Sequence, residues 1–158
     1  MCIKQNKKGQ NVKGDDMKGT KDILSSILKT TQMGQIGIRS ILNNELHTNL
    51  RKELNAQLRE YDALEREAHN IALSKGWKLK ELDPAIKSMT NIMTRTQLAF
   101  GNADSKAAKM MIQGNTRGII KGYKNLNQYP GTDLRVTNLA QKLIDFEETN
   151  NHQLQGFL

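Results

Sequence analysis

The sequence predicts an all-α protein, and three observations support that class. Only two prolines occur in 158 residues, and aromatic side chains make up 4% of them. Leu, Ile, Ala, Met, Lys, Glu and Gln are abundant, and these residues favour helix over sheet. Apolar residues also recur at three- and four-residue intervals in several long runs, which is the period of an amphipathic helix. The length fits one domain with its own core.

The first half of the chain predicts a helical hairpin. Thr20 is a candidate N-cap for a helix over residues 20–46, since it precedes the apolar stripe. A second helix is expected over residues 48–75, where Gly76 supplies a C-terminal stop. Because the connection between them is short, we expect the two helices to be antiparallel.

A shorter helix is expected in the middle of the chain. Asp83 is a good N-cap, and Pro84 would occupy the first helical position, where its missing N–H costs nothing. This helix is expected to end at Gly101 and to lie across the others. Its predicted buried stripe consists of Ile86, Met89, Met93, Thr96 and Phe100.

The second half of the chain predicts another hairpin. Asp104 or Ser105 is expected to cap a third long helix, which stops before Pro130. Thr132 or Asp133 then opens a last helix that runs almost to the C-terminus. Two antiparallel hairpins joined by one long crossover form the connectivity of ferritin-like bundles.

Several segments resemble the small bacterial ferritin-like four-helix proteins of the ferritin and rubrerythrin superfamily. They are QMGQIGIRSIL and LRKELNAQLREYDALEREAH in the first hairpin, and GNADSK and MIQGNTRGIIKGYKNL in the second. We therefore expect a ferritin-like four-helix bundle at residues 19–158, with the short helix in its crossover, after a disordered basic tail at residues 1–18. The resemblance implies a mid-helix Glu on two helices and, in iron-binding relatives, Glu-x-x-His on the other two. This sequence departs from both features.

Two carboxylate and histidine sets have identical spacing and are the obvious metal ligands. Asp62, Glu65 and His69 form one set, and the other includes Glu148 and His152. Inward-facing Glu and His on helices build di-iron and di-manganese sites. A helical projection, however, places only Glu65 near the centre of an apolar stripe, so the other four are the less favoured ligands.

The same projection finds one polar residue near the middle of each long apolar stripe: Gln35, Glu65, Asn115 and Glu147. The preferred interpretation is a central polar layer held by contacts of Gln35 with Glu65 and of Asn115 with Glu147, in which amides stabilise buried acids. The alternatives are a depleted metal site, in which Glu65 and Glu147 bind iron or manganese, and a misassigned helix phase.

Glycines inside the predicted helices need a compensating reason, because each costs about 1 kcal/mol relative to Ala. They are Gly34 and Gly37 in the first long helix and Gly114, Gly118 and Gly122 in the third. The favoured reason is close approach of these two helices. The alternative is room for a ligand or a partner helix beside the polar layer.

Charge and composition restrict the kinds of partner and the cellular compartment that we expect for this protein. Part of the net charge of +8 lies in the tail, and the other basic residues alternate with acidic ones, so nucleic acid is not expected beyond a weak association through the tail. No apolar run approaches the roughly 20 residues of a membrane span. The lone Cys2 and the absence of a signal-peptide pattern favour a cytoplasmic protein.

The sequence therefore favours a non-catalytic structural or protein-interaction module of uncharacterised role in the bacterial cytoplasm, acting as a homo-oligomer or with a protein partner. No cofactor and no enzymatic activity are expected, because the three histidines lie near helix ends or outside the apolar stripes. The rival hypothesis is a divergent metal-binding or oxidative-stress protein that uses iron or manganese.

Overall fold

The computed structural model describes residues 8–158, with the backbone alone for residues 8–13 and 15. This part of the chain folds into five helices without a strand, so the predicted all-α class is confirmed. The helices are α1 (Lys8–Leu42), α2 (Thr48–Ser74), α3 (Pro84–Leu98), α4 (Ala103–Gln128) and α5 (Leu134–Gln155). None of these five has the length and apolar character needed to cross a membrane.

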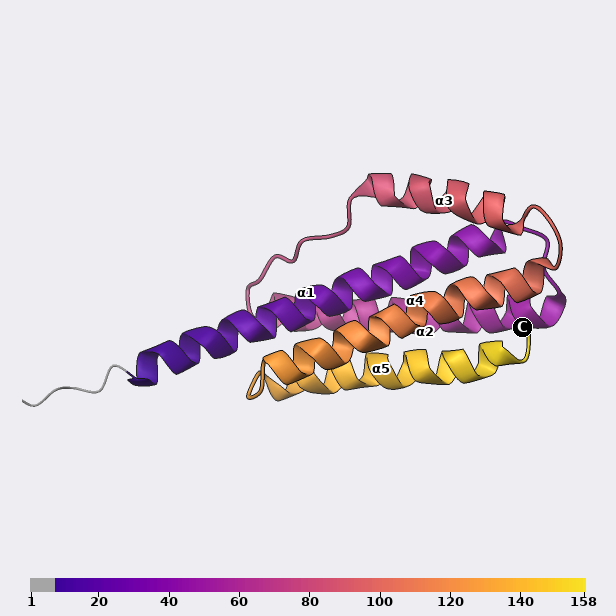
Figure 1. The fold of residues 1–158 in the computed structure, drawn as a ribbon. Coiled ribbons are helices and arrows are strands. Elements are labelled where there is room, and N and C mark those ends of the chain that lie inside the picture. The colour runs from indigo at the N-terminus through magenta and orange to yellow at the C-terminus, as the bar shows by residue number, and fades with distance from the viewer. Residues whose placement is uncertain (1–7) are drawn as a thin grey trace, which may run out of the picture.

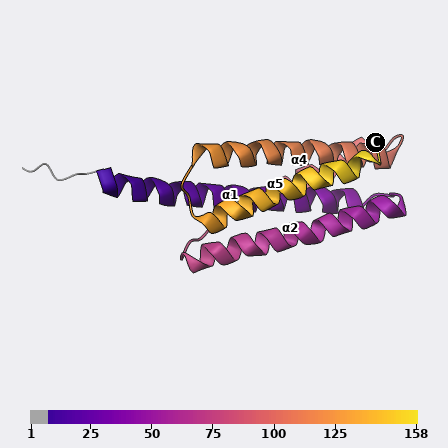
Figure 2. The same cartoon turned by 90° about the horizontal axis from the view of Figure 1, so that it is seen from below.

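The four long helices lie side by side, and α3 lies outside them over α1 and α4 (Figure 1). The pairs α1 with α2 and α4 with α5 are antiparallel hairpins, and α2 also packs on α5 (Figure 2). Because the extended segment after α2 and then α3 carry the chain back along the length of the molecule, α2 and α4 run in the same direction. The crossover thus covers one face of the packing between α1 and α4.

An Asp or Asn side chain caps the start of three helices. Asp83 and Asp133 accept hydrogen bonds from the backbone N–H groups at the starts of α3 and α5, as the sequence predicts. The prediction for α4 is wrong, since Asn102 accepts from the N–H of Ser105 at 3.1 Å. Asp104 instead accepts from the backbone N–H of His47 at 3.0 Å and so ties the first turn of α4 to the connection between α1 and α2.

Helix α1 starts much earlier than predicted. Residues 8–18 are helical, which contradicts the expected disordered tail over that range; residues 1–7 of the tail lie outside the described chain. Thr20 is not an N-cap, because its hydroxyl donates to the Asp16 carbonyl at 2.7 Å inside the helix. Tyr129 packs over Gly19, where a β-carbon would lie about 2.8 Å from its ring. Its hydroxyl also donates to Asp22 at 3.0 Å, so contacts from the other hairpin hold this part of α1.

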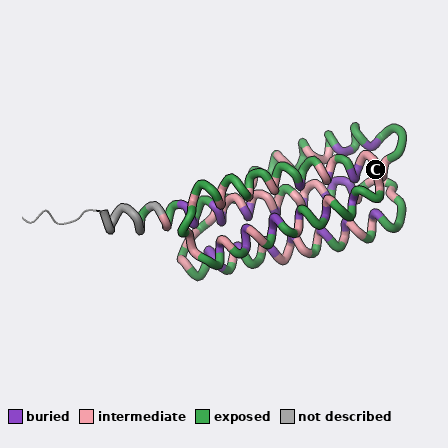
Figure 3. The backbone as a smooth tube through the Cα atoms, turned by 60° about the horizontal axis from the view of Figure 1, so that its bottom comes forward, coloured by how far each residue is buried: buried purple, intermediate pink, exposed green. Residues whose placement is uncertain are grey.

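The core runs along the inner faces of α1, α2, α4 and α5 (Figure 3). Tyr61 is among its largest fully buried side chains, and Phe146 packs edge-on against it with ring centroids 4.8 Å apart. Trp77 packs against the core from the start of the crossover. The largest fully buried aliphatic side chains of the core are Ile23, Leu24, Leu28, Ile38, Ile41, Leu50, Leu54, Leu64, Leu139, Ile144 and Leu154.

The buried face of α3 differs from the predicted stripe. Thr94 and Leu98 are buried, whereas Met89, Met93 and Phe100 are exposed. The hydroxyl of Thr94 donates to the carbonyl of the residue four positions earlier at 2.8 Å, so it can be buried without an unpaired donor. A prediction from apolar spacing alone therefore selects the wrong side of this helix.

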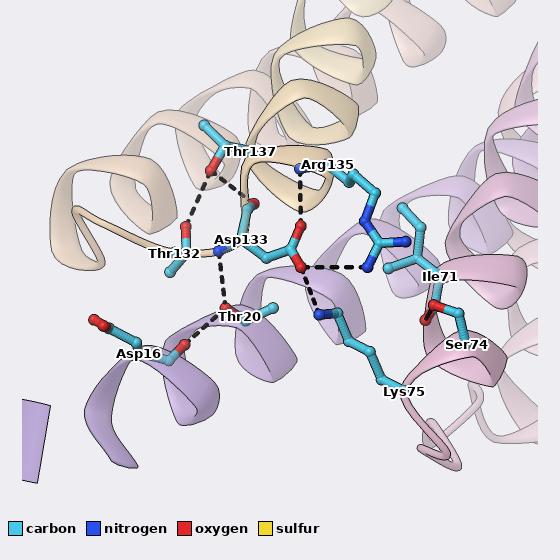
Figure 4. A network of polar contacts seen from close by, with 9 residues as sticks. All are labelled: Asp16, Thr20, Ile71, Ser74, Lys75, Thr132, Asp133, Arg135 and Thr137. Atoms are coloured by element: carbon cyan, nitrogen blue, oxygen red, sulfur yellow. Dashed lines mark hydrogen bonds and ion pairs between the residues drawn. The ribbon is translucent and has the colours of Figure 1, made fainter. Parts of the chain in front are cut away.

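A polar network fastens the start of α5 to α1 and α2 (Figure 4). The Asp133 carboxylate forms ion pairs with Lys75 at 2.5 Å and Arg135 at 3.4 Å, and its backbone N–H donates to Thr20 at 3.2 Å. The Lys75 ammonium is the main reason that the pKa of Asp133 falls to about 2. This acid is therefore a structural clamp at one end of the molecule.

Candidate functional site

A cavity of about 460 Å³ lies between α1, α3 and α4, and its floor reaches side chains of α2 and α5. This volume is within the roughly 300–1,000 Å³ range of small-molecule sites. Its walls are mostly apolar and include four methionines, Met33, Met93, Met110 and Met111. Four glycines also line it, Gly34, Gly37, Gly114 and Gly118.

The glycines make room for side chains and for the cavity. A β-carbon on Gly34 would lie 2.5–2.8 Å from the ring of Tyr61, and one on Gly118 would overlap the Glu147 carboxylate. A β-carbon on Gly37 would have the Met111 sulfur as its nearest neighbour, at 3.9 Å, and one on Gly114 would have no atom within 4 Å. The predicted close approach of two helix backbones is therefore not the reason for these residues. Side chains of α2 and α5 fill the space at Gly34, Gly118 and Gly122, whereas the space beside Gly37 and Gly114 is open; room for a ligand or a partner helix stays a prediction.

Three buried polar side chains meet at the floor of the cavity. Tyr61, Asn115 and Glu147 are 1%, 2% and 2% exposed. The Tyr61 hydroxyl lies 3.1 Å from Oδ1 of Asn115 and 3.0 Å from Oε1 of Glu147. Oε2 of Glu147 is buried and has no hydrogen-bond partner among the described side chains and backbone. Buried polar atoms are normally paired, so this unpaired oxygen, which fills the space beside Gly118, disfavours the ionised form of Glu147.

Burial changes the ionisation of this cluster. It raises the pKa of Glu147 to about 8, and the hydrogen bond from Tyr61 lowers that pKa by a smaller amount. Burial, together with the charge and hydrogen bond of Glu147, also raises the pKa of Tyr61 well above its ordinary value of 10.0. Both groups are therefore predominantly neutral at pH 7.

Protonation of Glu147 also explains how the Tyr61 hydroxyl can form hydrogen bonds with two neighbouring oxygens. The Tyr61 hydroxyl has one proton and lies within hydrogen-bond distance of two oxygens, on Asn115 and Glu147. A protonated Oε1 of Glu147 can donate to Tyr61, whose own proton then goes to Asn115. From there Asn115 donates to Asn151 at 3.1 Å, and Asn151 donates to Thr116 at 3.3 Å. All these bonds then point the same way, from the cavity floor to the surface.

Glu65 belongs to a second, separate cluster. Its carboxylate accepts from the amide of Gln32 at 2.9 Å and from that of Gln35, and His69 lies 3.6 Å away. Arg39 donates to the Gln35 carbonyl oxygen at 3.1 Å. The structure thus contains the contact between Gln35 and Glu65 that the polar-layer hypothesis requires.

The other contact of that hypothesis, between Asn115 and Glu147, is indirect in the structure because Tyr61 bridges the two side chains. The layer therefore has two parts. One is half-buried around Glu65, and the other is buried around Glu147.

The less favoured ligand candidates lie near the surface. Asp62 pairs with Arg39 at 3.3 Å, and His69 is half-buried beside Glu65. Glu148 and His152 are exposed, and Glu148 accepts from a tyrosine hydroxyl at 3.3 Å. The projection that turned these last two away from the core agrees with their exposure.

The donor set around the two buried acids does not fit a two-metal centre. Such a centre uses about four carboxylates and two histidines on facing helices. Both carboxylate oxygens of Glu65 accept from amide groups, and Glu147 bonds to a tyrosine. Within residues 8–158, no group of three His, Cys, Asp or Glu side chains is placed to hold a metal ion.

Basic side chains line one edge of the cavity. Lys29 of α1 and Arg117 and Lys121 of α4 all contribute to the lining, and the latter two are exposed. None of the three forms an ion pair with another side chain that the structure describes. The cavity edge is therefore electropositive.

Tyr61 is not among the site residues predicted from the sequence. A tyrosine hydroxyl that is buried requires a polar partner. On the projected stripes, Glu147 and Asn115 were the available partners from facing helices. That requirement makes both side chains possible partners of Tyr61, without showing that Tyr61 bridges them.

The fold and the cavity define an all-α protein with a methionine-lined site that has a polar floor. No protein-family model, no curated protein and no solved structure matches this chain.

Proposed function

We propose that this protein is a non-catalytic binding module, a ferritin-like bundle that holds an apolar small molecule in the cavity between α1, α3 and α4. One observation carries the proposal: an open volume of about 460 Å³ between α1, α3 and α4 has mostly apolar walls, with the buried polar side chains of Tyr61, Asn115 and Glu147 among its lining residues. Largely apolar pockets with a few convergent polar groups are the usual architecture of small-molecule sites.

The connectivity supports the ferritin-like part of the proposal. Helices α2 and α4 run in the same direction, and the extended segment after α2 together with α3 spans the distance between the end of one and the start of the other. A four-helix bundle with one long crossover has this connectivity. The resemblance noted in the sequence points to the same class.

The lining supports binding. Methionine side chains are flexible and polarisable, and they adapt to ligands of differing shape. Met33 and Met93 are partly exposed at the cavity, while Met110 and Met111 lie deeper. Four methionine side chains around an open volume can therefore adjust to the shape of an apolar ligand.

Binding is tested with N-phenyl-1-naphthylamine, a neutral apolar probe whose fluorescence rises in an apolar site. Leucine is placed at Gly37 or Gly114, where a β-carbon meets no close atom and the rest of the side chain enters the cavity. The matched control is Gly14→Leu, a helical glycine outside the cavity that also has open space around it. Each substitution gains helix propensity, so all three variants should remain folded.

We expect saturable binding to the wild type and to Gly14→Leu, and a loss of about tenfold or more in affinity for Gly37→Leu and Gly114→Leu. Equal binding by all four proteins would contradict the proposal. The predicted self-association and cytoplasmic location stay predictions; light scattering on the purified protein tests the former.

A further inference from the structure

We infer that the ligand is a single-chain amphiphile, whose anionic head group binds Lys29, Arg117 and Lys121 and whose apolar chain lies in the methionine-lined part of the cavity. This inference rests on the proposed binding function and specifies the chemistry of the same site. It depends on how charge and apolar surface are distributed along the cavity.

The basic residues lie at one end of the cavity. Lys29 is the first residue of α1 in the lining, and Lys121 is the last residue of α4. A β-carbon on Gly37 would lie 3.9 Å from the Met111 sulfur, which sets the level of these two antiparallel helices against each other. Counted from that contact, Lys29 and Lys121 lie within about one helical turn of the same level. Arg117 precedes Lys121 by one turn on the same face of α4.

The opposite end of the cavity is apolar and lies beside α3. Ile41 of α1 and Met110 of α4 line it, and the Ser40 hydroxyl donates to the Thr90 carbonyl of α3 at 3.4 Å. At 1.5 Å per residue, Lys29 and Ile41 are about 18 Å apart along α1, which is close to the length of an extended dodecyl chain with its head group. The cavity therefore matches a molecule with one charged end and one apolar end.

The charge at the basic end is not neutralised by the described part of the chain. None of the basic residues there forms an ion pair with a described side chain. Among the described residues, Glu147 is the one acid in the lining, and its pKa of about 8 keeps this buried carboxyl mostly protonated at pH 7. An anionic head group would complement the charge at this end, whereas an alkylammonium group would be repelled.

The same basic residues are accessible from solvent. Arg117 and Lys121 are exposed, and Lys29 is half-buried. Their long side chains are flexible, so they can close on a head group at the cavity edge. The apolar chain of the ligand would then extend between the methionine side chains, which adapt to its shape.

The test uses probes that differ in head group, in competition with N-phenyl-1-naphthylamine at pH 7. Dodecanoate has the expected anion, whereas dodecan-1-ol and dodecyltrimethylammonium carry a neutral and a cationic head group on the same chain. Hexanoate keeps the anion on a shorter chain. In the wild type we expect dodecanoate to bind at least about tenfold more tightly than each of the other three.

Two triple variants locate the head-group contact. The first combines Lys29→Gln, Arg117→Gln and Lys121→Gln, because one exposed ion pair alone contributes little. The matched control removes the same charge from exposed positions outside the cavity lining, through Lys21→Gln, Arg59→Gln and Lys109→Gln. We expect only the first variant to lose about tenfold in affinity for dodecanoate. Both should keep the wild-type affinity for dodecan-1-ol and N-phenyl-1-naphthylamine, which verifies that the cavity is intact.

The outcomes separate the inference from the proposed function. If N-phenyl-1-naphthylamine binds and responds to Gly37→Leu, but dodecan-1-ol competes as well as dodecanoate, the inference is wrong and the proposed function stands. Equal affinities of the two triple variants for dodecanoate would also overturn the inference, because the head group would then not depend on the basic end of the cavity. Equal binding of hexanoate and dodecanoate would overturn it as well, since the chain would make no contribution. If no probe binds, the proposed function itself fails.

Discussion

The carboxyl group of Glu147 occupies the space beside Gly118 that the β-carbon of any other residue would fill. The glycine on α4 and the acid on α5 therefore depend on each other. This pairing explains why a helix interior keeps a residue that costs about 1 kcal/mol relative to alanine. It also makes the acid sensitive to small changes on the neighbouring helix.

Gly118→Ala should destabilise the protein by roughly 1–3 kcal/mol, because the new methyl group overlaps a buried carboxyl that has little room to move. Gly114→Ala, one turn earlier on the same helix with open space around it, should instead stabilise by up to about 1 kcal/mol. Urea unfolding followed by circular dichroism measures both. If both substitutions change the free energy of unfolding in the same direction, the steric pairing of Gly118 with Glu147 is refuted.

The stability of the protein should fall as the pH rises, because of Glu147. Its pKa is about 8 in the folded chain against an ordinary value of 4.5. The protonated form thus stabilises the fold fully below pH 4.5, and this contribution is lost as the pH rises through 8. Each pKa unit between the two states corresponds to about 1.4 kcal/mol, so a loss of a few kcal/mol is expected between pH 5 and pH 9.

Glu147→Gln should remove this pH dependence, since the amide stays neutral. We expect the free energies of unfolding of variant and wild type to be similar near pH 5 and the variant to be more stable near pH 9. Glu148→Gln is the control, because that neighbouring acid is exposed. A wild-type slope that persists in Glu147→Gln would show that another group is responsible.

Tyr61→Phe should cost roughly 1–3 kcal/mol, because it leaves Asn115 and Glu147 with unpaired buried atoms. It should also raise the pKa of Glu147 further, since the hydrogen bond from Tyr61 lowers that pKa. The control is Tyr123→Phe, which removes an exposed hydroxyl that contacts Glu148 at 3.3 Å. Thermal unfolding at several pH values separates the two variants, and equal losses would argue against a special role for Tyr61.

The helices and several of their caps could be predicted from the sequence because these signals are local. Asp83 before Pro84 is a sufficient start signal for α3 on its own. The early start of α1 could not be predicted, because tertiary contacts support it: Tyr129 covers Gly19 and bonds to Asp22. The buried face of α3 was mispredicted since its inward residue, Thr94, bonds within its own helix.

The polar residues of the candidate site were predictable because each interrupts an apolar stripe, as Gln35, Asn115 and Glu147 do. The contact of Gln35 with Glu65 was also predicted, whereas the bridge that Tyr61 forms between Asn115 and Glu147 was not. Helical projection gives a direction for each side chain and no height along the neighbouring helices, so it could not show that Tyr61 reaches between Asn115 and Glu147. The cavity was also beyond projection, because it depends on how far α3 lies from α1 and α4.

Metal analysis should find no stoichiometric iron or manganese in protein purified without chelator. Amides already occupy both oxygens of Glu65, and displacing them would cost the half-buried carboxylate its hydrogen bonds. The metal content per chain is measured by elemental analysis of the wild type and of Glu65→Ala, before and after aerobic addition of iron. One or two metal ions per chain that vanish in Glu65→Ala would revive the metal-binding hypothesis.

The clamp at Asp133 should make acid unfolding depend on one carboxylate. Asp133→Asn keeps the cap on Arg135 and removes the charge that pairs with Lys75, so we expect a loss of about 1 kcal/mol at pH 7. Asp133→Ala should lose about 1 kcal/mol more, because the cap goes as well. Since the folded pKa is about 2 and the ordinary value 3.8, the advantage of the wild type over Asp133→Asn should be complete above pH 4 and vanish as the pH falls to 2. Asp83→Ala, which removes a cap without an ion pair among the described residues, should show no such acid dependence in urea unfolding.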